Sequence, residues 1–149
     1  MKASKNCLDL IKRFEGFKAT PYICAGGKIT IGIGSTYYAD GKPVAMTDKP
    51  ITLEQAETIL VANLNTYEEC VNFLVKTPLT QNQYDALISF AYNLGCGNFK
   101  TSTLLKLINL NPNHPMIQAN FLKWCKAGGK TLKGLLIRRQ VEWNLYNKK

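Results

Sequence analysis

Glu15 is the first residue of the chain whose type and setting suggest chemistry. It follows a stretch, Ser4 to Phe14, whose apolar residues recur at helical spacing, and Gly16 and Pro21 come soon after it. We therefore expect Glu15 at the C-terminal end of a short helix. The negative end of the helix dipole and the nearby Phe side chains would both favour the protonated carboxyl, which suits a general acid. The plainer interpretation is a glutamate that is exposed or paired with an arginine.

Two more residues follow Glu15 at defined intervals. Cys24 comes after eight intervening residues and Thr30 after five more, at the start of the run Thr30-Ile31-Gly32-Ile33-Gly34. With Glu15-Gly16, these positions resemble the active-site segment of phage-type lysozymes, glycoside hydrolase family 24. In that family a Glu, an Asp or Cys, and a Thr stand at these intervals.

The resemblance extends over nearly the whole chain. It includes Tyr22 and Gly27, and it continues in Leu79-Thr80-x-x-Gln83-x-Asp85-Ala86-Leu87-x-Ser89-Phe90-x-Tyr92-Asn93-x-Gly95, in Ser102-Thr103-Leu104-Leu105 and in Gly134-Leu135-x-x-Arg138-Arg139-x-x-Glu142. It implies an endolysin, a muramidase that hydrolyses the β-1,4 bond between N-acetylmuramic acid and N-acetylglucosamine in peptidoglycan. Host cell lysis for phage release would be its purpose.

The resemblance also implies a role for each candidate catalytic residue. Glu15 would protonate the glycosidic oxygen, while Cys24 and Thr30 would position or activate the attacking water. A free thiol titrates near pH ~8.5 against ~3.9 for Asp, so Cys24 is left with three roles: base, covalent nucleophile, or polar contact beside Thr30. Gly32 and Gly34 are expected to allow a close approach of the backbone.

The pattern of the remaining chain predicts an α+β, lysozyme-like fold in one domain, residues 1–149. A hairpin is expected within Thr20 to Thr36, and capping boxes at Thr52-x-x-Gln55 and Thr80-x-x-Gln83 mark two helix starts. Shorter helices at 103–109 and 116–126 and a last one over 135–146 should follow. We expect a lobe containing the small antiparallel sheet at about 15–50, a larger lobe of the N-terminal helix plus about 52–149, and the active-site cleft between them.

Charge and composition bear on which partners and cofactors the protein could bind. The net charge of +9 would draw the protein to polyanions, but the cations are scattered and no nucleic-acid-binding motif is present, so nucleic acid is not expected as a partner. Without clusters of His or carboxylates, neither a metal nor another cofactor is expected. Two alternatives remain open, a lytic transglycosylase acting on the same bond and a catalytically inactive wall-binding module.

The N-terminal sixteen residues contain no apolar run long enough for a signal peptide or a membrane anchor. We therefore expect no stable membrane insertion, and a protein that stays in the host cytoplasm until it is released to the periplasm or cell wall. The resemblance suggests a monomer. Its partners would be the glycan strands of peptidoglycan and, for release, a phage holin.

Overall fold

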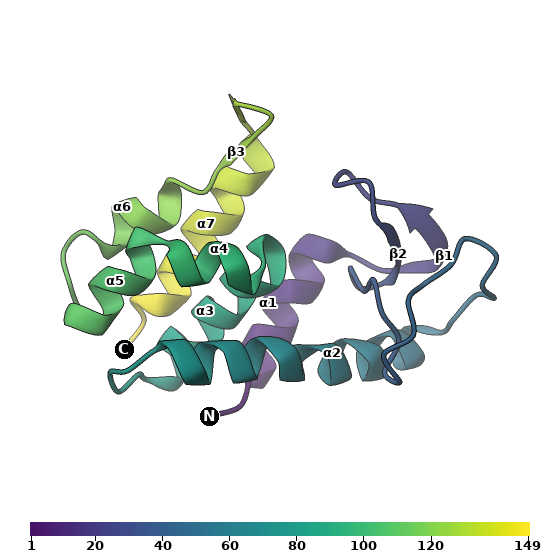
Figure 1. Ribbon diagram of the computed structural model, residues 1–149, viewed down its shortest axis with the longest axis horizontal. Helices are drawn as coiled ribbons and strands as arrows, with labels where there is room; N and C mark the ends of the chain where they lie inside the picture. Colours follow the sequence, from purple (N-terminus) through teal and green to yellow (C-terminus); the bar gives the residue numbers. More distant parts are fainter. The chain divides into compact units, whose positions relative to one another are not determined.

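The computed structural model describes residues 1–149, and its chain forms two compact units. We call residues 8–66 the hairpin unit, and residues 1–7 with 67–149 the helical unit. Helices predominate and the strands form two small antiparallel pairs, which confirms the predicted α+β class (Figure 1). No helix is both long enough and apolar enough to cross a membrane.

The hairpin unit is organised by strands β1 (Lys18–Ile23) and β2 (Ile29–Gly32). The strands pair antiparallel, with Tyr22 opposite Thr30, and the register is irregular between Lys18 and Tyr22. The chain from 37 to 52 is irregular apart from one bridge between Tyr37 and Pro43. This long connection is fixed at its end by the Ile51 N–H, which donates to the Ala19 carbonyl at 2.9 Å.

Two helices flank the hairpin in sequence, α1 (Lys5–Glu15) and α2 (Leu53–Leu74). The predicted capping box starts α2, because the Gln55 N–H donates to Thr52 Oγ1 at 3.1 Å and the Thr52 N–H donates to Gln55 Oε1 at 2.9 Å. Their apolar faces bury the core of the hairpin unit together with β2. This core contains Leu10, Ile11, Ile31, Ile33, Val44, Ala56, Ile59, Leu60 and Leu64.

The helical unit is built around α3 (Gln81–Leu94), which packs against α7 (Lys133–Tyr146) and α4 (Cys96–Thr101) (Figure 1). The second predicted capping box, at Thr80 and Gln83, is present at its start. Helices α5 (Thr103–Leu110) and α6 (Ile117–Leu122) complete the unit. Phe90 lies at its centre, with edge contacts to the rings of Phe99, Phe121 and Trp124.

A buried ion cluster joins α3 to α7. Glu142 is fully buried, and its carboxylate lies 2.8 Å from Arg139 Nε and 3.4 Å from Arg138 Nε. Ser89 donates its hydroxyl to the same carboxylate at 2.6 Å. Burial raises the pKa of Glu142 and lowers that of Arg139 to about 10, so each charge depends on the other for its stability. Glu142 thus pairs with both arginines of its own helix, at the i−4 and i−3 positions.

The structure departs from the predicted elements at three segments. The helix predicted over 116–126 ends already at Leu122, and Lys126 belongs to a short strand. Helix α4, which was not predicted, begins at Cys96 and includes Gly97. The Gly128-Gly129 pair forms the turn between two short strands, β3 (Lys126–Ala127) and β4 (Lys130–Thr131). Both glycines have positive φ, which such a two-residue turn requires.

Candidate active site

Glu15 is the last residue of α1, as predicted. The Gly16 N–H donates to the Lys12 carbonyl at 2.9 Å, and Gly16 adopts a φ of 66°, so the helix ends immediately after the glutamate. The Glu15 side chain is half-buried, and so is that of Phe14. Phe17, which was expected to shield the carboxyl group, is instead 41% exposed.

Gly34 lies directly against the carboxyl group of Glu15. A Cβ atom at position 34 would stand 2.6 Å from Glu15 Oε2 and 2.9 Å from its Cδ, and Gly34 has a φ of 68°. A larger residue would therefore meet both backbone strain and a steric clash. The backbone at Gly34 thus lies beside the carboxyl group, and the expected close backbone approach is made to a side chain of the protein itself.

Gly32 has a different role two residues earlier. Its φ is also 68°, and a Cβ there would lie 3.0 Å from the Ala56 Cβ and 3.2 Å from Ile51 Cδ1. The glycine lets β2 pack closely on the first turn of α2. It supports the hairpin's position and takes no part in chemistry.

Cys24 lies just beyond β1, at the start of the turn between the strands. Its N–H donates to the Lys28 carbonyl at 2.9 Å and its carbonyl accepts the Gly27 N–H at 2.8 Å, so the turn is closed at this residue. Partial burial works to raise the pKa of the thiol. Hydrogen bonds from the Thr30 side chain and from the backbone of Lys28, Gly26 and Cys24 outweigh that effect, and they hold the pKa of Cys24 below its ordinary value.

Thr30 is 2% exposed and faces Tyr22 across the hairpin. Its hydroxyl donates to the Lys28 carbonyl at 3.0 Å, while the same hydroxyl also stabilises the Cys24 thiolate. A hydroxyl has one proton and rotates freely, so it cannot donate to both at once.

Tyr22 links these residues and was not selected as a site residue from the sequence. Partial burial raises the pKa of its phenol, and the negative charges of Glu15 and Cys24 raise it further, so both groups lie within electrostatic reach. The Lys18 ammonium lies 4.4 Å from the centre of the Tyr22 ring. Tyr22 lies two residues before Cys24 and opposite Thr30, and this pattern could have identified it as a site residue.

The hairpin unit thus contains a carboxyl group, a thiol with a lowered pKa, a buried hydroxyl and a tyrosine shared between them. An acid and a group that can take a proton are what acetal cleavage needs on the two sides of the bond. The structure has no group of three or more His, Cys, Asp or Glu side chains placed to hold a metal ion.

All five cysteines are free thiols, but their environments differ. Burial raises the pKa of Cys7, with further increases from Asp85, Glu68 and Glu142. Burial and contact with the Cys70 side chain raise the pKa of Cys96 to about 12. Of these three thiols, only Cys24 has a pKa below the ordinary value.

Comparison with known proteins adds independent findings. The family model described as phage lysozyme matches residues 12–142, which includes all three predicted site residues. The endolysin of Acyrthosiphon pisum secondary endosymbiont phage 1 is 41% identical over 98% of this chain and 98% of its own length. The endolysin of Bacillus phage PZA is 39% identical over 99% of this chain, which spans only 55% of that protein.

A solved structure gives the same result for the fold. The endolysin from Escherichia coli O157:H7 phage FAHEc1 superposes with a TM-score of 0.89 at 38% identity. The match covers 99% of this chain and 94% of that one.

Proposed function

The chain belongs to the phage lysozyme family, glycoside hydrolases that act on peptidoglycan, and from this premise we propose a specific reaction for it. The protein is a muramidase that hydrolyses the β-1,4 bond between N-acetylmuramic acid and N-acetylglucosamine. Glu15, Cys24 and Thr30 carry out the chemistry. The observation that supports this assignment most strongly is the position of Tyr22, which places one phenol within electrostatic reach of both Glu15 and Cys24.

Glu15 is the general acid in this proposal. It gives its proton to the glycosidic oxygen as the bond from that oxygen to the anomeric carbon breaks. It is the last residue of α1, where the carbonyl groups of the helix C-terminus carry partial negative charge. Gly34 holds the carboxyl group in place, which preserves its alignment with the leaving oxygen.

Cys24 is the base that activates water, and Thr30 supports it. The Cys24 thiolate takes a proton from water as the water oxygen bonds to the anomeric carbon. The products are two sugar ends. Glu15 has then lost one proton to the glycosidic oxygen, and Cys24 has gained one from water. The thiolate form is the one that the Thr30 hydroxyl and the turn backbone stabilise. These hydrogen bonds favour the thiolate, which is the form of a thiol that can accept a proton.

This pair of groups has a consequence for pH dependence. The productive state has Glu15 protonated and Cys24 ionised, whereas a carboxyl ordinarily loses its proton well before a thiol does. Only a fraction of molecules is then productive at any pH, and the lowered pKa of Cys24 enlarges that fraction. We expect a bell-shaped profile of kcat/KM against pH, whose two limbs belong to the coupled pair.

Analysis of the cut ends tests the reaction type. Purified peptidoglycan is digested, and the new sugar ends are identified by mass spectrometry. Hydrolysis gives free reducing ends that carry one oxygen from water, which is detected as a mass increase in ¹⁸O-labelled water. Anhydro ends without the label would instead identify a lytic transglycosylase, and would refute the assignment of Cys24 as a base for water.

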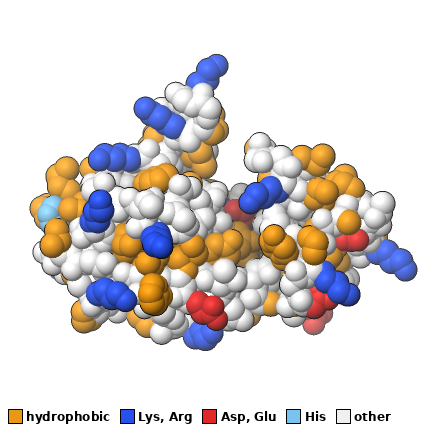
Figure 2. Space-filling model, viewed as in Figure 1, with side chains coloured by type: hydrophobic (Ala, Val, Ile, Leu, Met, Phe, Trp, Pro, Cys, Tyr) orange, Lys and Arg blue, Asp and Glu red, His pale blue; other side chains and the backbone are white.

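The charge of the protein fits this substrate. Lys and Arg number 19 against 10 Asp and Glu, and Figure 2 shows the cations spread over the visible face, including the end of the β3–β4 hairpin. The peptide carboxylates of peptidoglycan would attract such a surface. We further propose that the protein acts as a monomer and reaches the wall through a pore formed by a holin.

A further inference from the structure

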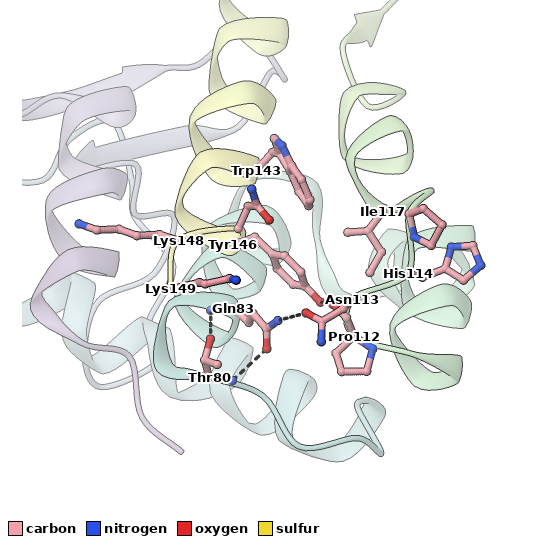
Figure 3. A pocket seen from close by; sticks show the side chains of 12 residues that line it. Thr80, Gln83, Pro112, Asn113, His114, Ile117, Trp143, Tyr146, Lys148 and Lys149 are labelled. Carbon is pink, nitrogen blue, oxygen red and sulfur yellow. Dashed lines mark hydrogen bonds between the residues drawn. The ribbon is translucent and has the colours of Figure 1, made fainter.

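A cavity of about 320 Å³ lies in the helical unit and shares no residue with the candidate active site (Figure 3). Its walls come from the N-terminal end of α3, the loop before α6, and the C-terminal end of α7. Ile117 and Tyr146 are buried in its floor, and Trp143 is half-buried with its ring stacked 5.9 Å from that of Tyr146. The volume is within the range of about 300–1,000 Å³ that ligand sites occupy.

The walls of this cavity are held by hydrogen bonds. Tyr146 donates its hydroxyl to the Pro112 carbonyl at 2.6 Å, which ties α7 to the loop. His114 Nδ1 accepts the Met116 N–H at 3.1 Å, and the His114 N–H donates to the Asn111 carbonyl at 2.9 Å. The cavity is therefore preformed, and a ligand would not have to order the loop.

The polar groups at the cavity are mainly neutral donors. Gln83 is 7% exposed; its Oε1 accepts the Thr80 N–H at 2.9 Å, and its Nε2 donates to Asn113 Oδ1 at 3.4 Å. Asn113 thus keeps its amide N–H groups for a ligand. Because His114 Nδ1 is an acceptor, its Nε2 carries the proton in the neutral ring. In Figure 3 this ring extends away from the other labelled side chains, so Asn113 is the clearer donor.

The charged side chains in the lining are Lys148 and Lys149, and no Asp or Glu side chain lines the cavity. In Figure 3, Lys149 points toward the labelled side chains of the cavity, while Lys148 extends away from them. A ligand that also carries an acidic group would therefore meet no acidic side chain in the lining. The lining as a whole combines apolar and aromatic side chains with amide donors.

We propose that this cavity binds one N-acetylated sugar unit of the wall glycan, apart from the site where the glycan is cut. The apolar floor receives the acetamido methyl group and the ring carbons, and the amide N–H groups of Asn113 bind the acetamido carbonyl or a sugar hydroxyl. The choice of ligand rests on the proposed function. Such a site would keep the protein on its polymeric substrate between cuts.

The single histidine of the chain makes the test specific. His114 lines the cavity and is the only His in the sequence, so its ring signal in a ¹H–¹³C spectrum reports this site alone. The full chain carrying Glu15→Gln is titrated with a trimer of N-acetylglucosamine, so that no cutting interferes. We expect a saturable shift of the His114 signal, with a Kd of about 1 mM for so small a neutral ligand.

Variants and other sugars separate specific binding from surface effects. Asn113→Ala should raise the Kd by about fivefold or more through the lost hydrogen bonds, whereas Asn144→Ala, an exposed amide next to Trp143, should not change it. A glucose trimer, which lacks acetamido groups, should shift the signal far less. A disaccharide of N-acetylglucosamine and N-acetylmuramic acid shows whether the acid-bearing sugar is also accepted.

Three results would overturn the proposal: no shift of the His114 signal, an equal Kd in Asn113→Ala, or an equal response to the glucose trimer. None of them depends on catalysis, because the protein carries Glu15→Gln. A failure of the proposed reaction would be seen separately, in the digestion of peptidoglycan by the parent protein.

Discussion

Substitution of Gly34 by alanine tests how the structure positions the proposed acid. The added Cβ would stand 2.6 Å from Glu15 Oε2, and the residue would have to keep a φ of 68°. The left-handed backbone costs alanine roughly 1–2 kcal/mol relative to glycine. The overlap with the carboxyl group adds about 1–3 kcal/mol if nothing moves, so the Glu15 side chain is expected to shift instead.

The shift of Glu15 should be visible mainly in the reaction rate. A displacement of about 1 Å at a catalytic group can cost on the order of a hundredfold in rate. Gly41→Ala is the matched control, because Gly41 has a φ of 84° and nothing within 4 Å of its added Cβ. It isolates the backbone strain, and should lose roughly 1–2 kcal/mol of stability while its clearing rate stays close to that of the parent.

Both variants are measured by urea unfolding and by the loss of turbidity of a peptidoglycan suspension. Clearing rates are compared at urea concentrations well below the unfolding midpoint of each variant. A loss of activity then cannot be caused by unfolding. Equal clearing rates in Gly34→Ala and Gly41→Ala would refute the argument that the hairpin positions the carboxyl group of Glu15.

Three other predictions follow from the charges and thiols. Iodoacetamide at neutral pH should label Cys24 before Cys7 or Cys96, because hydrogen bonds lower the pKa of Cys24 while burial raises the pKa of the other two thiols. The labelled peptides are identified by mass spectrometry, and earlier labelling of Cys96 would contradict the prediction. Glu142→Leu should lose about 3–5 kcal/mol in urea unfolding, since it leaves Arg139 buried without its partner; a loss under 1 kcal/mol would be inconsistent with that role. Clearing of whole walls should slow as salt reduces the screening length from about 30 Å to 8 Å, whereas cutting of small neutral oligosaccharides should not.

Much of the fold could be predicted because local signals and long-range packing agree. The capping boxes at Thr52 and Thr80 fix two helix starts through side chains three residues away, which a sequence shows directly. The end of α1 at Glu15 followed from Gly16 in the same way. Helix α4 was missed because its start at Cys96 follows Gly95 and its second residue is Gly97, and glycine ordinarily disfavours helix.

The candidate site was only partly accessible from the sequence. Spacing and resemblance selected Glu15, Cys24 and Thr30, but the lowered pKa of Cys24 depends on a turn geometry that no sequence pattern shows. The sequence indicated that the backbone at Gly34 approaches something closely, but it did not show that this is the Glu15 side chain. The two residues are far apart along the chain, so no local pattern reveals the contact. Tyr22 required the register of the hairpin, which sets the residues that face each other.

The most direct test of the central claim compares peptidoglycan clearing by the parent protein and by Glu15→Gln, with folding of both checked by urea unfolding. The amide keeps the shape of the side chain and cannot donate a proton as an acid does. The account predicts that clearing falls by about two to four orders of magnitude, the usual contribution of general acid catalysis, while stability is retained. A Glu15→Gln protein that clears peptidoglycan as fast as the parent would contradict the assignment of Glu15 as the acid.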